Sequence, residues 1–174
     1  MKILLTLLLS SAVCFGQQRS EKPLNPNTTD TYIKTSDNLT LKAAFEIAAR
    51  ATQSASSFDR NVSIAVLDAS GTTLLLIKGD GVGPHNTEAA RRKAFTALST
   101  KTPTLVLLRN AESNVDTKNL NSLPELLLLS GGVPLWYKGN VIGSIGVAGG
   151  GSPENDDLIA KAASLTELGI TSIK

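Results

Sequence analysis

The sequence predicts an α+β domain in which helices pack against a single antiparallel sheet of five strands. Two apolar runs come early in the chain, three come late, and segments with helical periodicity lie before, between and after them. The late runs are joined by two or three residues, which requires antiparallel neighbours. A chain of 174 residues is long enough for one such domain and too short for two ordinary ones.

The first sixteen residues predict a signal peptide. Lys2 supplies a positive start, a mostly apolar stretch follows, and the segment ends at Gly16 with small residues at cleavage-site spacing. The apolar stretch is well short of the roughly 20 residues of a transmembrane helix. Cys14 leaves a lipid-anchored form open. We therefore expect a periplasmic or secreted protein with no transmembrane segment in its mature chain.

Residues 17–38 predict a flexible arm and residues 39–174 the domain, because the arm contains Pro23, Pro26 and few apolar residues. Cleavage after Gly16 removes the only cysteine, which excludes disulfides and thiol catalysis. The formal net charge of the whole chain is only +2. This weak charge gives no reason to expect a nucleic acid as partner.

The first predicted element of the domain is an amphipathic helix over residues 41–55, capped by Thr40. Its apolar residues recur at intervals of three and four: Leu41, Ala44, Phe45, Ala48, Ala51 and Ala55. Two short apolar runs, 62–68 and 73–78, then predict a hairpin around the turn-like residues 69–72.

Residues 79–86 predict an irregular, shaped loop, because three glycines and a proline interrupt any regular pattern. A second helix is expected from Asn86 or Thr87 to about Thr100. Residues 103–123 predict a short helix followed by a loop.

Three strands are expected in quick succession, at residues 125–130, 133–137 and 141–148. The last helix begins after Ser152, which has the position of a cap before a proline at the first helical residue. Gly169 is expected to end it.

Six segments, taken in their order along the chain, resemble the GlcG/HbpS-type haem-binding family, also called haem-degrading-domain-like. These segments are residues 66–71, 79–86, 89–97, 131–135, 139–147 and 149–150. The resemblance covers about 39–169 and implies a profilin-like fold, self-association into a homo-oligomer, and haem binding in exported members. The chain departs from the family at Lys78-Gly79-Asp80, where the family often has arginine-methionine-aspartate. Family membership does not fix a reaction.

His85 is the only histidine in the sequence, and its imidazole is a possible ligand of haem iron. Gly83 and Asn86 flank it and complete a candidate binding loop. The alternative is structural, because the same side chain can lock the turn with a local hydrogen bond. One histidine per chain cannot form a multi-histidine zinc centre by itself.

Arg91 and Arg92 are the candidate partners of the haem propionates, since guanidinium groups pair well with carboxylates. The alternative is a solvated helix face, because Glu88 lies three and four residues earlier, at ion-pair spacing. Consecutive helical residues point about 100° apart, so Arg91, Arg92 and Lys93 cannot form one patch.

Gly143, Gly146 and residues 149–151 lie between a strand and a helix, but their spacing does not match a dinucleotide-binding motif. Small residues on a strand more simply permit close approach by a helix or by a second subunit. Trp136 and Tyr137 are expected to face opposite sides of the sheet.

Taken together, the sequence predicts an exported haem-binding protein that sequesters or presents haem, and no catalytic residue. One alternative is an enzyme or enzyme accessory acting on a hydroxy-acid or carbonyl compound, with His85 as proton donor. Another alternative is an oligomeric interaction subunit without a ligand. The nucleophile-elbow pattern of serine hydrolases is absent, which disfavours catalysis of that kind.

Overall fold

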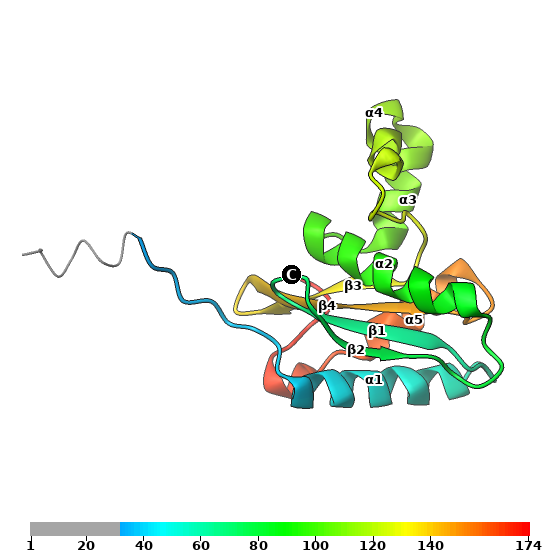
Figure 1. The fold of residues 1–174 in the computed structure, drawn as a ribbon, viewed down its shortest axis with the longest axis horizontal. Helices are drawn as coiled ribbons and strands as arrows, with labels where there is room; N and C mark the ends of the chain where they lie inside the picture. Colours follow the sequence, from blue (N-terminus) through cyan, green and yellow to red (C-terminus); the bar gives the residue numbers. More distant parts are fainter. Residues whose placement is uncertain (1–31) are drawn as a thin grey trace, which may run out of the picture. The chain divides into compact units, whose positions relative to one another are not determined.

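Four antiparallel strands form a single sheet in residues 32–174, the part of the chain that the computed structural model describes (Figure 1). They are β1 (Ser63–Asp68), β2 (Thr73–Ile77), β3 (Gly132–Tyr137) and β4 (Asn140–Ala148). Their order across the sheet is β2-β1-β4-β3. The α+β class, the early hairpin and the late hairpin are therefore confirmed.

The prediction of a fifth strand at residues 125–130 is wrong. The backbone amide of Leu127 donates to Thr96 Oγ1 at 2.8 Å, and the carbonyl of Leu126 accepts from Arg92 at 2.7 Å. Leu126 and Leu128 also pack in one apolar cluster with Leu107. Helix side chains thus satisfy backbone groups that a strand would pair in the sheet.

Helices cover both faces of the sheet, as Figure 1 shows. On one face lie α1 (Leu41–Ser56) and α5 (Pro153–Ala162), and on the other lies α2 (Pro84–Thr100). Successive side chains of β1 point to opposite faces of the sheet. Ile64 and Val66 pack in the core with α1 and α5, and Ala65 and Leu67 pack against α2.

The first helix begins as predicted, with the Thr40 hydroxyl accepting from Ala43 N at 3.2 Å. Leu41 and Phe45 were expected to face inward, but they are 53% and 55% exposed. The buried face is built from Ala44, Ile47, Ala48, Ala51 and Ala55.

Helix α2 begins earlier than predicted, at Pro84 rather than at Asn86 or Thr87. The fixed φ of proline suits the first helical position, and Gly83 takes the cap position before it. His85 and Asn86 therefore lie on the first turn of a helix and not within the loop.

Two glycines let α2 press directly onto the sheet. A Cβ built at Gly146 of β4 would overlap the carbonyl oxygen of Ala90, and one built at Gly132 of β3 would overlap that of Lys93. Close helix approach, the simpler interpretation of the strand glycines, is confirmed at Gly146. The contact brings the side chain of Lys93 to the end of the sheet.

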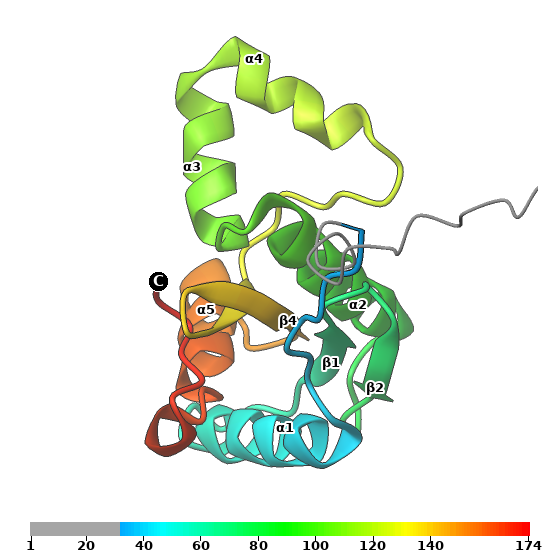
Figure 2. The same cartoon turned by 90° about the vertical axis from the view of Figure 1, so that its left-hand side faces the viewer.

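The segment after α2 is more helical than expected. It contains α3 (Thr104–Ser113), the short α4 (Val115–Lys118) and the 3-10 helix η2 (Asn119–Ser122). Asn114 Oδ1 caps α4 by accepting from Asp116 N at 2.9 Å. Figure 2 shows this segment extending beyond α2, away from the sheet.

The chain ends in short elements. Helix α5 ends at Ala162 rather than near Gly169, and the 3-10 helix η3 (Thr166–Leu168) follows as a separate turn. Gly169 ends η3 in a left-handed conformation, with φ 74°. The backbone of Thr171 then pairs with Trp136 at the edge of β3.

Leu39 belongs to the compact unit of the fold, since it is buried and its amide donates to the carbonyl of Ile142 at 3.1 Å. Residues 36–174 form this compact unit. The predicted signal peptide, Cys14 and most of the predicted arm lie outside the described residues. Within residues 32–174, no helix is both long and apolar enough to cross a membrane.

Candidate functional site

A pocket of about 330 Å³ lies between the first turns of α2 and α5. The two helices bring together residues that are far apart in sequence, with His85 and Asn86 from α2 and Ser152 and Pro153 from the start of α5. The rest of the lining comes from Ala89, Lys93, Leu108, Leu129, Ser130, Gly151 and Asp156. Two of the predicted site residues, His85 and Asn86, therefore line the same pocket.

The imidazole of His85 folds back over Gly83. A Cβ built at Gly83 would lie 2.9 Å from His85 Cε1 and 3.1 Å from Nδ1. The backbone of Gly83 has φ −62°, which any residue adopts, so the missing side chain matters here and not the backbone freedom. Gly83 contributes to the site by leaving space for the ring of His85.

A buried ion pair lies at the pocket wall. Lys93 Nζ donates to Asp156 Oδ2 at 2.7 Å and to the carbonyl of Val147 at 2.9 Å. The side chains of Lys93 and Asp156 are only 5% and 11% exposed. Asp156 Oδ1 also accepts from Gly150 N at 2.7 Å. The pair links α2, β4 and α5 at one point.

Burial lowers the pKa of the Lys93 ammonium below its ordinary value, because the charged form loses solvation. The adjacent carboxylate of Asp156 opposes this shift by attraction and by its hydrogen bond. Burial and the Asp156 carboxylate thus act on the pKa of this amine in opposite directions.

Neither predicted propionate partner lines this pocket. Arg91 pairs with Glu88 at 2.7 Å and with Glu125 at 2.9 Å, and both partners hold the pKa of Arg91 above its ordinary value. The guanidinium of Arg92 donates to the carbonyl of Leu126 at 2.7 Å. The expected ion pair at the Glu88 spacing is thus confirmed for Arg91, and the role of either arginine toward haem stays a prediction.

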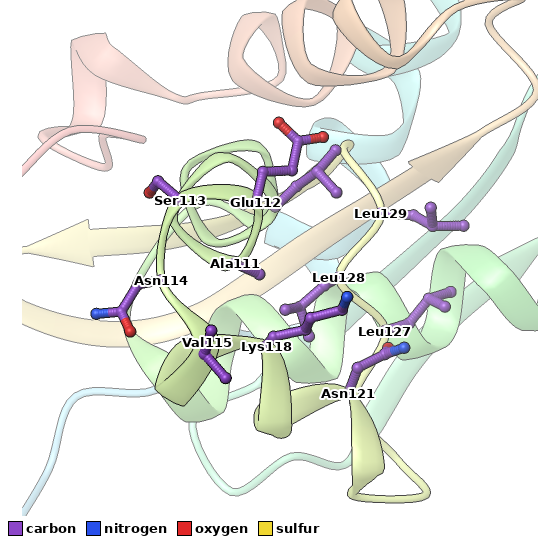
Figure 3. A pocket seen from close by; sticks show the side chains of 11 residues that line it. Ala111, Glu112, Ser113, Asn114, Val115, Lys118, Asn121, Leu127, Leu128 and Leu129 are labelled. Atoms are coloured by element: carbon purple, nitrogen blue, oxygen red, sulfur yellow. The ribbon is translucent and has the colours of Figure 1, made fainter.

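A second, larger pocket of about 640 Å³ adjoins the first, since Leu108 and Leu129 line both. Figure 3 shows its lining side chains, which come from α3, α4, η2 and the connection to β3. The walls are largely aliphatic, with Ala111, Val115, Leu127 and Leu128 among them. Glu112, Ser113, Asn114, Lys118 and Asn121 complete the lining. Within the described part of the chain, no aromatic side chain lines either pocket.

Lys93 and Asp156 are site residues that the sequence did not predict. The available signal was the place of Lys93 on α2, three residues after Ala90 and four before Ala97, both of which are fully buried. A cation on the apolar face of a helix needs a partner. Residues 32–174 hold no group of three or more histidine, cysteine, aspartate or glutamate side chains suited to a metal ion.

Residues 39–164 match the model of the family described as "Haem degrading protein HbpS-like". The crystal structure of HbpS is similar to the chain with 40% identity and a TM-score of 0.71, covering 76% of this chain and 92% of HbpS. A double mutant of Streptomyces reticuli HbpS matches with 34% identity and a TM-score of 0.71, covering 90% of this chain and 95% of the mutant.

The fold and these matches define an α+β domain with one antiparallel sheet flanked by helices. The chain belongs to the HbpS-like family, which confirms the predicted resemblance. The crystal structure of a PduOC–haem complex shares the fold with a TM-score of 0.70 at 24% identity, covering 79% of this chain and 99% of PduOC.

Proposed function

We propose that this protein binds haem and either sequesters it or presents it to a partner. The observation that carries the proposal is that two pockets adjoin. The only histidine of the chain lines the smaller pocket, and six of the eleven residues that line the larger one are aliphatic. The family and the PduOC–haem complex support the same ligand.

The larger pocket fits an extended apolar group. Its volume of about 640 Å³ lies within the range of about 300–1,000 Å³ common for small-molecule sites. Val115 is 78% exposed and Leu129 is 50% exposed, so apolar surface is available to a ligand there. A porphyrin ring held by these residues would reach Leu108 and Leu129, which also line the pocket of His85.

His85 is the candidate iron ligand, because a neutral imidazole is the commonest protein ligand of haem iron. When bound, haem would supply an iron centre that accepts this nitrogen. Lys118 lines the larger pocket and is a candidate partner for a propionate there. Arg92 remains a candidate, whereas Arg91 would have to leave Glu88 and Glu125.

Export and self-association are part of the proposal. The positive start, apolar stretch and small residues of the first sixteen positions support a signal peptide and hence a periplasmic or secreted protein. The family resemblance supports a homo-oligomer. Detection of the N-terminus of the mature protein by mass spectrometry tests the first point, and light scattering tests the second.

The haem proposal is tested by haemin titration of the chain from Gln17 onward, followed by absorbance. We expect a saturable Soret shift that weakens in His85→Ala and is unchanged in Ser99→Ala, an exposed position on the same helix that lines neither pocket. Absence of a saturable shift in the unmodified protein would overturn the proposal.

The larger pocket has its own matched pair of variants on the α3–α4 segment. Val115 lines the pocket, whereas Val106 is 42% exposed on α3 and does not. We expect Val115→Asp to weaken haemin binding and Val106→Asp to leave it unchanged, because only the first places a charge against the porphyrin. Equal effects of the two substitutions would mean that the porphyrin ring does not bind in the larger pocket.

A further inference from the structure

The smaller pocket contains polar groups that haem binding through His85 does not use. Asn86, Lys93, Ser130 and Ser152 all line it. Lys93 is 4% exposed and Ser130 is 2% exposed, so both side chains are buried in the protein interior. A volume of about 330 Å³ is at the lower end of the range for ligand sites and fits a group much smaller than a porphyrin.

Lys93 brings an unused hydrogen-bond donor to this pocket. A protonated lysine has three N–H donors. Among the described residues its ammonium has two acceptors, the Val147 carbonyl at 2.9 Å and Asp156 Oδ2 at 2.7 Å. The third N–H is available to an acceptor inside the pocket that Lys93 lines.

Further donors come from the first turns of the two helices. The Ser152 hydroxyl accepts from Asn155 N at 3.1 Å, which leaves its own hydrogen free to donate. Asn86 adds a side-chain amide from the first turn of α2. Both helices direct the positive ends of their dipoles toward their first turns, which favours negative charge there.

The charges around the pocket favour an anion. Lys93 and Asp156 neutralise each other, and among residues 32–174 no other acidic side chain lines the pocket. At the rim, the guanidinium of Arg60 lies against Gly151, since a Cβ built at Gly151 would be 3.0 Å from Arg60 Nε. Glu154 is exposed and lies outside the lining.

We propose that this pocket is a carboxylate site in which Lys93 and Asn86 donate to the ligand. The aliphatic remainder of the ligand would lie against Ala89, Leu108 and Leu129. The carboxylate belongs either to a free small organic acid or to a propionate arm of a porphyrin in the larger pocket. Only the second source rests on the proposed haem function.

The test uses sodium propionate as probe and propionamide as a control of nearly the same shape without charge. His85 gives the only histidine ring signals in an NMR spectrum, so its Cε1–H resonance reports on the pocket. For the chain from Gln17 onward we expect a saturable shift with propionate and none with propionamide. A linear response, or equal responses to both compounds, would refute the site.

Three variants locate the binding. Removing one hydrogen bond with Asn86→Ala should weaken propionate about two- to tenfold. The double variant Lys93→Met with Asp156→Leu should abolish binding, and it removes both charges so that no buried ion is left unpaired. Ser99→Ala is the matched control and should bind normally. Unchanged affinity in the first two variants would overturn the proposal.

Calorimetry of propionate with haemin-saturated protein distinguishes the two sources. Loss of propionate binding means that a porphyrin carboxylate occupies the site, and retained binding means that a free acid does. If haemin does not bind at all, the titration without haemin still tests the carboxylate site, so the two proposals fail independently.

Discussion

The inner and outer faces of α2 carry cations that differ in almost every physical respect, although Lys93 and Arg91 are two residues apart. Lys93 is buried, bonds to the sheet and to α5, and has one acidic partner. Arg91 is partly exposed and shares two exposed glutamates at the surface. The inner face carries a buried pair that links three elements, whereas the outer face carries exposed ion pairs.

The largest difference between the two faces is expected in stability. Lys93→Met leaves Asp156 buried without its partner, which costs about 3–5 kcal/mol for a broken buried pair. Urea denaturation followed by circular dichroism measures this loss. The double variant Lys93→Met with Asp156→Leu should recover most of the loss, and a double variant as unstable as the single one would contradict this account.

A second prediction concerns the contact that places Lys93. Gly146→Ala introduces a methyl group into the carbonyl of Ala90, and the overpacked interface should lose about 1–3 kcal/mol or more. Thermal unfolding gives the size of the loss. Ser144→Ala, two residues earlier on β4, is the control, because the buried Ser144 hydroxyl has no partner among the described residues and its removal should be nearly neutral. Equal losses of stability in both variants would show that any substitution in β4 is destabilising, and not only one at the contact with α2.

The α+β fold class, the two hairpins, the cap residues Thr40 and Ser152, and the close approach of a helix at Gly146 could all be predicted from the sequence. It failed at residues 125–130, because an apolar run does not reveal whether its backbone will bond to another strand or to Thr96 and Arg92. It also did not single out the Lys93–Asp156 pair. Its two members are 63 positions apart and meet only through the packing of α2 and α5 around β4.

On the outer face, Arg91→Met should cost less than about 1 kcal/mol, because exposed ion pairs contribute little. The loss should shrink as salt is raised, since salt screens exposed charges. Urea denaturation at low and high ionic strength measures both effects. A salt-independent loss as large as that of Lys93→Met would show that the two faces do not differ in this way.

The smallest expected effect is a dependence of the outer face on pH. The hydrogen bond from Arg91 lowers the pKa of Glu88 below its usual value of 4.5, against a weaker opposing effect of burial. A carboxyl whose pKa is lowered by folding contributes stability that is present above pH 4.5 and is lost as the pH falls through its folded pKa. Because Glu88 is 57% exposed, the contribution is a few tenths of a kcal/mol. Glu88→Gln should therefore be slightly less stable than the unmodified protein at pH 7, and the difference should disappear once the pH falls below the folded pKa of Glu88. Stability curves for Glu88→Gln and the unmodified protein that stay parallel from neutral to acid pH would mean that the Arg91 pair does not stabilise the fold.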